Sequence, residues 1–226
     1  MTERIQTIIA GLNTKAGVKQ KVYKRTSDVF NTLKNQAQKL VSKIDPEVKV
    51  VSPEVETVVN DYGDFEFHLK FSGDTVVFLM HTNVFTFPPN HGVSKSKYIK
   101  QEPNRGYFGM IQVYNFLSDS IKYNRLGDPG YLLARIYINN ENHFYVDGKR
   151  QLGFLYKNVE KQEISDDVLC SIIEQCILYC IDFDLYVPPA DSFEQITIQE
   201  KNYFNNPTGL ATGKRLGFKV INRAKQ

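Results

Sequence analysis

Tryptophan and long apolar runs are absent from this chain of 226 residues, and cysteine is rare. The longest uninterrupted apolar stretch covers residues 176–181, far below the roughly 20 residues of a membrane-spanning helix. At the N-terminus, Glu3 and Arg4 precede only a short apolar patch, which is not the apolar core of a secretory signal peptide. We therefore expect no signal peptide, no membrane segment and no membrane partner.

The three cysteines, Cys170, Cys176 and Cys180, lie in one segment and are odd in number. This usage is typical of a reducing compartment rather than of a disulfide framework, so it predicts a cytoplasmic protein. Their spacing is not that of a zinc site, and no histidine accompanies them. Signatures such as H-E-x-x-H and G-x-S-x-G are also missing, and residues 209–215 depart from a phosphate-binding loop. We expect no metal and no cofactor.

The composition is that of a globular protein, with 42% apolar, 23% charged and 12% aromatic residues, which excludes intrinsic disorder and collagen-like repeats. The small net charge of +3 hides three zones: residues 1–44 carry +7, residues 45–200 carry −10 and residues 201–226 carry +6. These zones predict a basic amphipathic helical segment at 1–44, an α+β core domain at 45–200, and a basic tail at 201–226 that belongs to the same domain.

The two basic zones allow two interpretations. They fold against the acidic middle of the chain, which we favour, or they reach a partner of opposite charge. Lysine and arginine side chains suffice for salt-dependent phosphate binding, so a nucleic-acid-associated protein is an alternative hypothesis. Its candidate contacts are six cations of the basic zones: Lys19, Lys21, Lys24, Arg25, Lys214 and Arg215.

The N-terminal zone has the pattern of helices. A short helix is expected over residues 3–12, and Gly11 and Gly17 predict a break or kink after it. From about residue 15 to residue 44, apolar residues recur every three or four positions, which indicates an amphipathic helix that ends at Asp45-Pro46. Its apolar side either docks on the sheet of the same chain, as we favour, or forms a homodimer.

The middle of the chain has the pattern of strands joined by short turns. Residues 65–71 alternate strictly, which places Phe65, Phe67, Leu69 and Phe71 in a core and Glu66, His68 and Lys70 in water. A turn at 72–74 and a long apolar strand at 75–87 complete a hairpin. Further strands are expected within 48–60 and at 107–117, 131–138, 143–146 and 151–156.

After these strands, Ser165 followed by two aspartates is typical of a helix N-cap, and the apolar segment after it predicts a buried helix near 165–185. The tail is expected to be loop-like, with a short strand at 216–221. The fold class that follows is α+β: a single antiparallel sheet of about six strands, with the long N-terminal helix and the buried helix packed on one face.

Arg135 is the most informative candidate for a site, because it interrupts the apolar strand at 132–138. A guanidinium in such a strand needs a partner, which is either an internal carboxylate such as Asp147 or Glu66, or an anionic ligand. Strand alternation places Tyr131, Leu133, Arg135 and Tyr137 on one face. The residues that we expect to bind the ligand are Arg135, Tyr114, Tyr137, His81 and His143.

Three hypotheses for the function follow. We favour a cytoplasmic, non-enzymatic binding or regulatory module, which binds a protein or a small anionic ligand at a sheet-face pocket or partner surface around Arg135 and dimerises through its N-terminal helix. The second hypothesis is the nucleic-acid-associated protein. The third is an enzyme acting on an anionic substrate, with His81 or His143 as the general base and Arg135 as the anion clamp.

Overall fold

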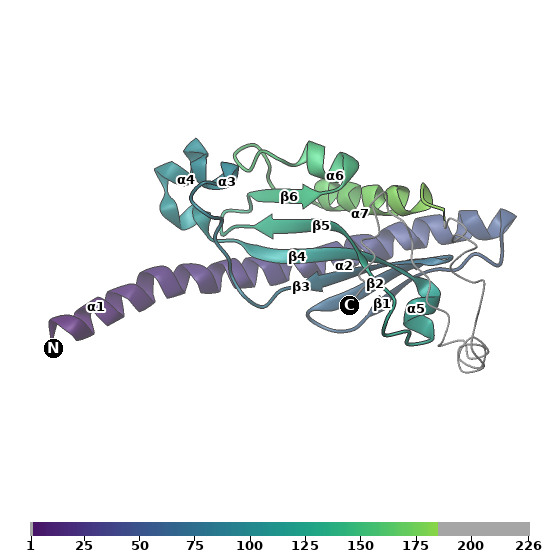
Figure 1. The fold of residues 1–226 in the computed structure, drawn as a ribbon, viewed down its shortest axis with the longest axis horizontal. Coiled ribbons are helices and arrows are strands. Elements are labelled where there is room, and N and C mark those ends of the chain that lie inside the picture. The colour runs from purple at the N-terminus through teal and green to yellow at the C-terminus, as the bar shows by residue number, and fades with distance from the viewer. Residues whose placement is uncertain (1, 185–226) are drawn as a thin grey trace, which may run out of the picture.

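One continuous helix forms the N-terminal part of the chain (Figure 1). It consists of α1 (Glu3–Gly11), a π-helical turn (Leu12–Ala16) and α2 (Gly17–Val51). The predicted break at Gly11 and Gly17 is therefore wrong, since both glycines keep right-handed helical dihedral angles and the irregularity is absorbed as a π turn. The computed structural model describes residues 2–184, so the predicted strand at 216–221 lies outside the described residues.

The predicted helix end at Asp45-Pro46 is also wrong, because Pro46 lies inside α2. Proline removes the N–H that would bond to the carbonyl of Ser42, yet the helix continues for another turn and a half. Side-chain contacts hold this stretch, since the Asp45 carboxylate lies 2.6 Å from Lys49 Nζ and accepts a hydrogen bond of 2.6 Å from Thr57 Oγ1. The helical segment thus extends beyond the expected boundary at residue 44.

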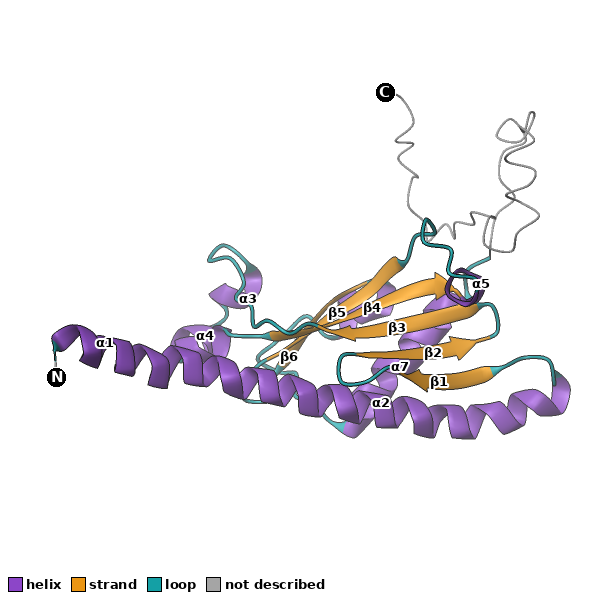
Figure 2. Ribbon diagram, turned by 90° about the horizontal axis from the view of Figure 1, so that it is seen from below, coloured by secondary structure: helices purple, strands orange, loops and turns teal. Residues whose placement is uncertain are grey.

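The six strands form one antiparallel sheet in which every strand pairs with its neighbours in sequence, in the order β1 to β6. This meander confirms the predicted α+β fold class (Figure 2). Short connections favour such pairing, because antiparallel neighbours need only a tight turn. The strands are β1 (Thr57–Asp61), β2 (Glu66–Phe71), β3 (Asp74–Met80), β4 (Gly109–Leu117), β5 (Tyr131–Ile138) and β6 (Phe144–Gly148).

Two predicted strands differ from the structure. The expected strand at 151–156 is the short helix α6 (Arg150–Leu155), in which Leu152 is buried and Phe154 points to solvent. The expected strand at 75–87 ends at Met80, although Phe85 still pairs with Phe108 through an isolated bridge. The outer edge of β6 is covered by residues 156–164, whose backbone exchanges hydrogen bonds of 2.9 to 3.1 Å with residues 142–146.

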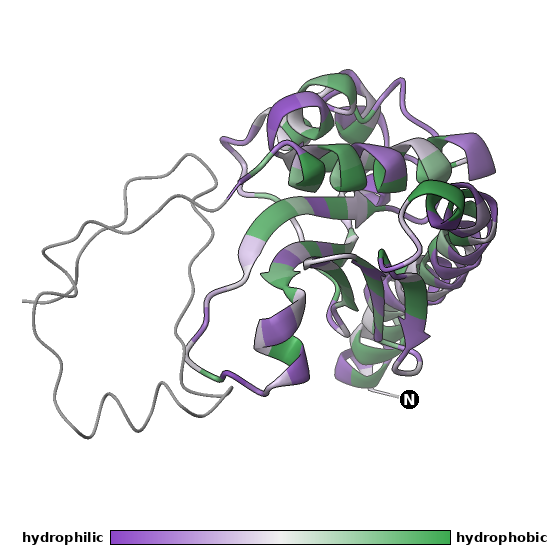
Figure 3. Ribbon diagram, turned by 90° about the vertical axis from the view of Figure 1, so that its right-hand side faces the viewer, coloured by the Kyte–Doolittle hydropathy of each residue, from purple (hydrophilic) through white to green (hydrophobic). Residues whose placement is uncertain are grey.

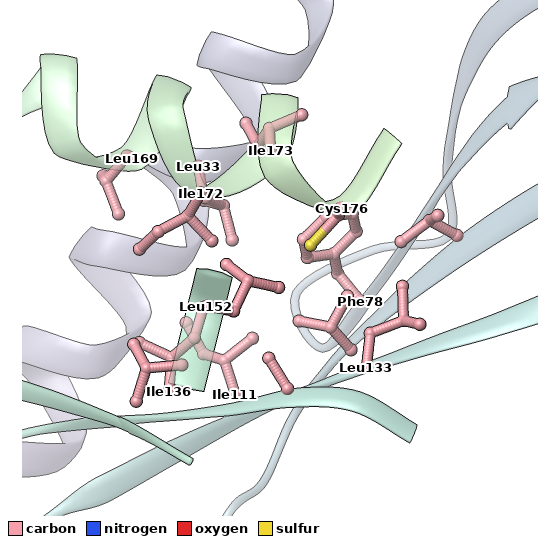
Figure 4. Close-up of a cluster of buried hydrophobic side chains, with 14 of the residues drawn as sticks. Leu33, Phe78, Ile111, Leu133, Ile136, Leu152, Leu169, Ile172, Ile173 and Cys176 are labelled. Atoms are coloured by element: carbon pink, nitrogen blue, oxygen red, sulfur yellow. The ribbon is translucent and has the colours of Figure 1, made fainter. Parts of the chain in front are cut away.

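The main core lies between one face of the sheet and two helices, α2 and α7 (Asp166–Ile181), as Figure 4 shows. Ser165 caps α7 as expected, since its hydroxyl accepts a hydrogen bond from the backbone N–H of Val168. Along the long helix, hydrophobic and hydrophilic residues alternate (Figure 3), and its apolar side docks on the sheet from Val22 onward. Phe67 and Leu69 are buried in this core, as predicted, and Phe71 packs against it partly buried. The prediction for Phe65 is wrong, because this residue precedes β2 and its side chain is exposed.

The opposite face of the sheet is covered in part: the connection between β3 and β4 covers one end, and Tyr62, which precedes β2, covers His68 at the other. This connection contains α3 (Gly92–Lys95), α4 (Lys97–Gln101) and a 3-10 turn (Pro103–Gly106), and it forms a second, smaller apolar cluster with Met110 and Tyr137. A further short helix, α5 (Ser118–Lys122), follows β4. The candidate site lies where the β3–β4 connection borders the open part of this face.

The N-terminal third of the long helix projects beyond the sheet (Figures 1 and 2). It exposes a stripe of large apolar side chains, among which Ile8 is 59% and Leu12 is 60% exposed. None of the helices in residues 2–184 combines the length and the apolar content needed to cross a bilayer.

Candidate functional site

Arg135 lies on the sheet face opposite the two long helices, where the strand register places it directly across from Asp147 on β6 and Gln112 on β4. Its guanidinium Nη2 donates a hydrogen bond to the Asp147 carboxylate. This contact is an internal ion pair with a carboxylate. It was one of the two alternatives expected for Arg135 from the sequence, the other being an anionic ligand. The two side chains remain 40% and 47% exposed, so the pair faces open space rather than the core.

The predicted alternation along β5 is wrong at Leu133. The register shifts there, because Val113 pairs with Ala134 whereas the next residue of β4, Tyr114, pairs with Leu132. Leu133 is thus the extra residue of a β-bulge, and both Leu133 and Ala134 are fully buried. In consequence Leu133 and Tyr131 contribute to the helix-covered core, while Arg135 and Tyr137 face the other side.

A pocket of about 420 Å³ opens above the ion pair. One wall consists of Tyr137 and Tyr145 from β5 and β6, and the other comes from the β3–β4 connection through Phe85, Thr86, Phe87, Pro88 and His91, with Met110 at the base. The rings are in mutual contact: Phe87 is stacked on His91 at 4.4 Å and lies edge-on to Tyr137 at 4.8 Å. We call this the Arg135 pocket.

The electrostatics of the Arg135 pocket follow from the ion pair and from burial. The hydrogen bond to Asp147 raises the pKa of Arg135 above its usual value, so the guanidinium stays charged. Burial raises the pKa of Tyr137 and of Tyr145, so both phenols keep their protons at neutral pH. The Arg135 group also lies 5.8 Å from the centre of the Tyr137 ring, within cation–π range.

Two of the predicted site residues, Arg135 and Tyr137, are brought together in this pocket, and Tyr114 is their neighbour on β4. The Tyr114 hydroxyl accepts a hydrogen bond of 3.1 Å from Gln112 Nε2, and its ring lies 6.5 Å from that of Phe116. Tyr114 thus extends the polar and aromatic face but does not line the Arg135 pocket.

His81 lies just past the end of β3 and outside the Arg135 pocket. Its Nδ1 accepts a hydrogen bond of 3.0 Å from the backbone N–H of Asn83, and its ring lies edge-on to Phe85 at 4.8 Å. These contacts shape the chain reversal after β3. His81 therefore supports Phe85, which does line the pocket.

His143 belongs to a polar network that fastens the β3–β4 connection to the β5–β6 turn. Its Nδ1 lies 2.8 Å from the carbonyl oxygen of Val159, and its ring lies 4.5 Å from that of Tyr98. The Tyr98 hydroxyl donates to Glu141 at 2.8 Å and accepts from Asn139 at 3.0 Å. Burial is the main reason that the pKa of Tyr98 rises to about 12. His143 is thus engaged in holding these segments together.

The structure also corrects the prediction for His68, which was expected in water. Its side chain is only 9% exposed, because Tyr62 covers the ring at 4.3 Å and Glu66 lies 2.6 Å from Nε2. Strand alternation did place His68 on the face away from the helices, but the chain before β2 folds over that face. The sequence of β2 alone does not show that the preceding segment covers His68.

Of the six cations considered for nucleic-acid binding, four are described and lie on the long helix. Lys21 and Lys24 are exposed, Arg25 is partly covered, and Lys19 lies 5.7 Å from the centre of the Tyr107 ring. Lys214 and Arg215 lie outside the described residues. No group of three or more His, Cys, Asp or Glu side chains within residues 2–184 is arranged to hold a metal ion.

Comparison of the chain with models of protein families, with curated proteins and with solved structures finds no match in any of the three. The geometry of the described residues is therefore the basis for a functional proposal. Within it, the Arg135 pocket combines aromatic walls with a charged pair, which is the usual composition of a small-molecule site.

Proposed function

We propose that the chain is a cytoplasmic, non-enzymatic binding or regulatory module whose ligand occupies the Arg135 pocket. The observation that carries this proposal is the half-exposed ion pair of Arg135 and Asp147 within a pocket walled by aromatic rings. Ion pairs on an open sheet face contribute little to stability, about 0–1 kcal/mol, so fold stability alone gives little reason to place one there. Binding gives a reason, because a charged pair orients a ligand.

The composition of the pocket defines the class of ligand. Phe87, His91, Tyr137 and Tyr145 favour a planar ring, since ring stacking and edge contacts stabilise by about 0.5–1.5 kcal/mol per pair beyond burial. The ion pair then offers a donor beside an acceptor. A simple anion would have to compete with Asp147 for the guanidinium, whereas a ring that carries an acceptor next to a donor satisfies both groups. We therefore favour a planar heterocycle with a polar edge over a bare anion.

The enzyme hypothesis needs His81 or His143 beside Arg135, and neither histidine lines the Arg135 pocket. His91 does line it, but its Nδ1 accepts a hydrogen bond of 3.3 Å from Val93 N–H as the cap of α3. A binding role is consistent with this arrangement, because it requires recognition of a ring and no proton transfer.

The test is a ligand-observed NMR screen of the full chain against free purine and pyrimidine bases, their nucleosides and aromatic carboxylates. We expect at least one heterocycle with adjacent donor and acceptor groups to bind. Arg135→Ala and Tyr145→Ala should each weaken its affinity about tenfold or more, which corresponds to the loss of roughly 1.4 kcal/mol. Phe154→Ala, which removes an exposed ring outside the pocket, is the matched control.

Two results would overturn this proposal. One is that no heterocycle of the panel binds. The other is that a bound heterocycle keeps its affinity in both Arg135→Ala and Tyr145→Ala while these variants remain folded by circular dichroism.

A second element of the proposal is a homodimer through the projecting part of the long helix. Support comes from the exposed apolar stripe of Ile5, Ile8, Ile9 and Leu12, which no described residue covers. A second copy also offers complementary charge, because residues 1–44 are basic and residues 45–200 are acidic.

Static light scattering measures the molar mass in solution and thereby tests whether the chain forms this dimer. We expect twice the chain mass for the unchanged protein and the monomer mass for Ile8→Glu combined with Leu12→Glu. Asn13→Glu, which adds a carboxylate at an exposed polar position of the same helix, is the control and should stay dimeric. A monomer mass for the unchanged chain at its highest soluble concentration would remove this element and leave the binding proposal intact.

A further inference from the structure

The end of α2 lies far from the projecting part of the long helix (Figure 1). There, an apolar cavity of about 220 Å³ lies between α2, the end of α7 and the strands β1 and β2. Among the described residues that line it, only Thr57 and Ser72 are polar, and the Thr57 hydroxyl is already bonded to Asp45. We call this cavity the α2–α7 groove. Its main apolar side chains are Ile44, Val48, Leu69, Phe71, Ile177 and Ile181.

The α2–α7 groove is open at its rim. Ile181 is 62% exposed although it lines the groove, and Ile44 and Val48 are only partly buried. Val50 and Val51, which follow on α2, are largely exposed. An exposed apolar patch of this kind usually marks an interaction surface. An apolar cavity of about 150 Å³ holds a benzene ring, so the groove has room for one large aliphatic side chain.

The projecting part of the long helix offers side chains of this kind. Residues 3–16, which we call the arm, have no buried side chain within residues 2–184. At 1.5 Å per residue the arm is about 20 Å long, and packed helices lie about 8–10 Å apart, so an arm is long enough to cross both α2 and α7. Its exposed apolar side chains recur every three or four residues: Ile5, Ile8, Ile9 and Leu12.

The arm of a chain does not reach the groove of the same chain. Ile8 and Ile44 belong to one continuous helix and are 36 residues apart in it, which corresponds to about 54 Å. The α2–α7 groove therefore has to receive an arm from a second copy.

Charge favours an arm on the groove over an arm on another arm. Residues 2–25 contain six Lys or Arg and one Glu, whereas residues 166–184 contain five Asp or Glu and no Lys or Arg. Asp182 is paired with Arg150, but the segment keeps a net negative charge. Two arms packed together bring like charges near each other, while an arm on α7 brings opposite charges together.

We propose that the arm of a second copy occupies the α2–α7 groove, with Ile8 or Leu12 inserted between α2 and α7. This inference rests on the homodimer of the proposed function and adds the surface that the arm covers. Arm and groove are different surfaces, so a single contact would join copies head to tail. Two contacts, one in each direction, close the pair.

Ile181→Lys tests the groove, with static light scattering over a range of concentrations as the measurement. We expect the dissociation constant of the dimer to rise about tenfold or more, because the added cation would be desolvated beside a basic arm. Leu126→Lys, which adds the same charge at an exposed aliphatic position outside the groove, is the matched control and should dimerise like the unchanged chain.

Two results of this experiment would overturn the inference, and they differ in what they leave. A dimer as stable in Ile181→Lys as in the unchanged chain, with the variant folded by circular dichroism, would remove the groove from the interface and leave the homodimer standing. A monomer mass for the unchanged chain at its highest soluble concentration would remove the homodimer as well.

A mixture of two variants tests whether arm and groove meet directly. Ile8→Glu combined with Leu12→Glu has a defective arm and an intact groove, and Ile181→Lys has the reverse. Each should be monomeric alone at concentrations where the unchanged chain is dimeric. Equal amounts should form a mixed dimer, since one contact is native and the other pairs a lysine with glutamates. A mixture that stays at the monomer mass would overturn the inference.

Cross-linking with a short bismaleimide tests the same contact without a charged substitution. In a Cys170→Ser chain, whose two remaining cysteines are buried, Leu12→Cys and Ile181→Cys supply one reactive thiol each. We expect a cross-linked dimer from the mixture of these two chains and none from either alone. Cross-linking of Leu12→Cys with itself, and not with Ile181→Cys, would assign the arm to another arm and overturn the inference.

Discussion

Gly109 of β4 and Thr26 of α2 are in such close contact that a Cβ on Gly109 would lie 1.9 Å from Thr26 Oγ1. The Thr26 side chain is fully buried, and its hydroxyl donates a hydrogen bond of 2.8 Å to the carbonyl oxygen of Val22. The hydroxyl therefore has no room to move away. Through this contact α2 packs directly against β4.

Gly109→Ala should destabilise the fold, because the added methyl group forces helix and strand apart. We expect the free energy of unfolding to fall by about 1–3 kcal/mol, the usual effect of overpacking a core. Urea denaturation followed by circular dichroism measures it. Gly127→Ala is the control, since a Cβ there meets nothing within 4 Å, and it should change the free energy by less than about 0.5 kcal/mol. Equal stability of the two variants would contradict this packing.

Arg135→Ala and Asp147→Asn should leave the fold nearly as stable as before. Both side chains are substantially exposed, and exposed pairs contribute about 0–1 kcal/mol. Urea denaturation of each variant checks this expectation. A loss above about 3 kcal/mol would show that the pair is a structural element of the sheet and would weaken its assignment to a ligand.

The stability of the protein should fall steeply above pH 10, in part because of Tyr98. Its pKa is raised from 10.0 to about 12 in the folded chain, chiefly by burial. The unfolded chain thus loses this phenolic proton first, and between about pH 10 and 12 its ionisation favours unfolding. Tyr98→Phe should make the fall shallower in urea titrations across this range, whereas Tyr62→Phe, at an exposed ring, is the control. An identical pH profile for Tyr98→Phe and the unchanged chain would contradict this prediction.

One thiol should react with iodoacetamide in the native protein, and two should not. Cys170 is partly exposed, whereas Cys176 and Cys180 are fully buried on α7. Burial raises the pKa of the Cys176 thiol to about 12, so the reactive thiolate is scarce as well as inaccessible. Burial and the Glu174 carboxylate raise the pKa of Cys170 as well, so its modification should be slow at neutral pH and should accelerate as the pH rises. Mass spectrometry should show this one modification, which Cys170→Ser abolishes. Rapid modification of two thiols in the folded chain would show that α7 is less firmly packed than described.

The periodicity of apolar residues predicted the sheet, the long helix and α7, because these elements are long enough for the pattern to be distinguished from a random one. It did not predict α6, since Leu152, Phe154 and Tyr156 occupy alternate positions in a window of only six residues, as in a strand. The structure buries Leu152 and Tyr156, which are four positions apart, and exposes Phe154. The sequence pattern also did not predict that α2 continues past Pro46. It depends on the contact between Asp45 and Thr57, which are distant enough in sequence that no local rule joins them.

The candidate site was predicted in part. Arg135 and Tyr137 are in the pocket, and Asp147 was named as one candidate partner of Arg135. The predicted turn at 139–142 would have paired Ile138 with His143 and Arg135 with Val146. In the structure the N–H of Asn139 bonds to the carbonyl of His143, so Ile138 pairs with Phe144 and Arg135 with Asp147. The contribution of Phe87 and His91 was missed, since it depends on how a connection of 28 residues folds back over the sheet. Local pattern does not determine such a path.

The continuous helix from Glu3 to Val51 has a hydrodynamic consequence. At 1.5 Å per residue it is about 73 Å long. A compact chain of this size has a radius of gyration of only roughly 17 Å, so the helix is longer than a compact fold is wide. The molecule should therefore diffuse more slowly than a sphere of equal mass. Early elution from a gel-filtration column would then reflect the rod-like arm as much as self-association, so the stoichiometry has to be taken from scattered light.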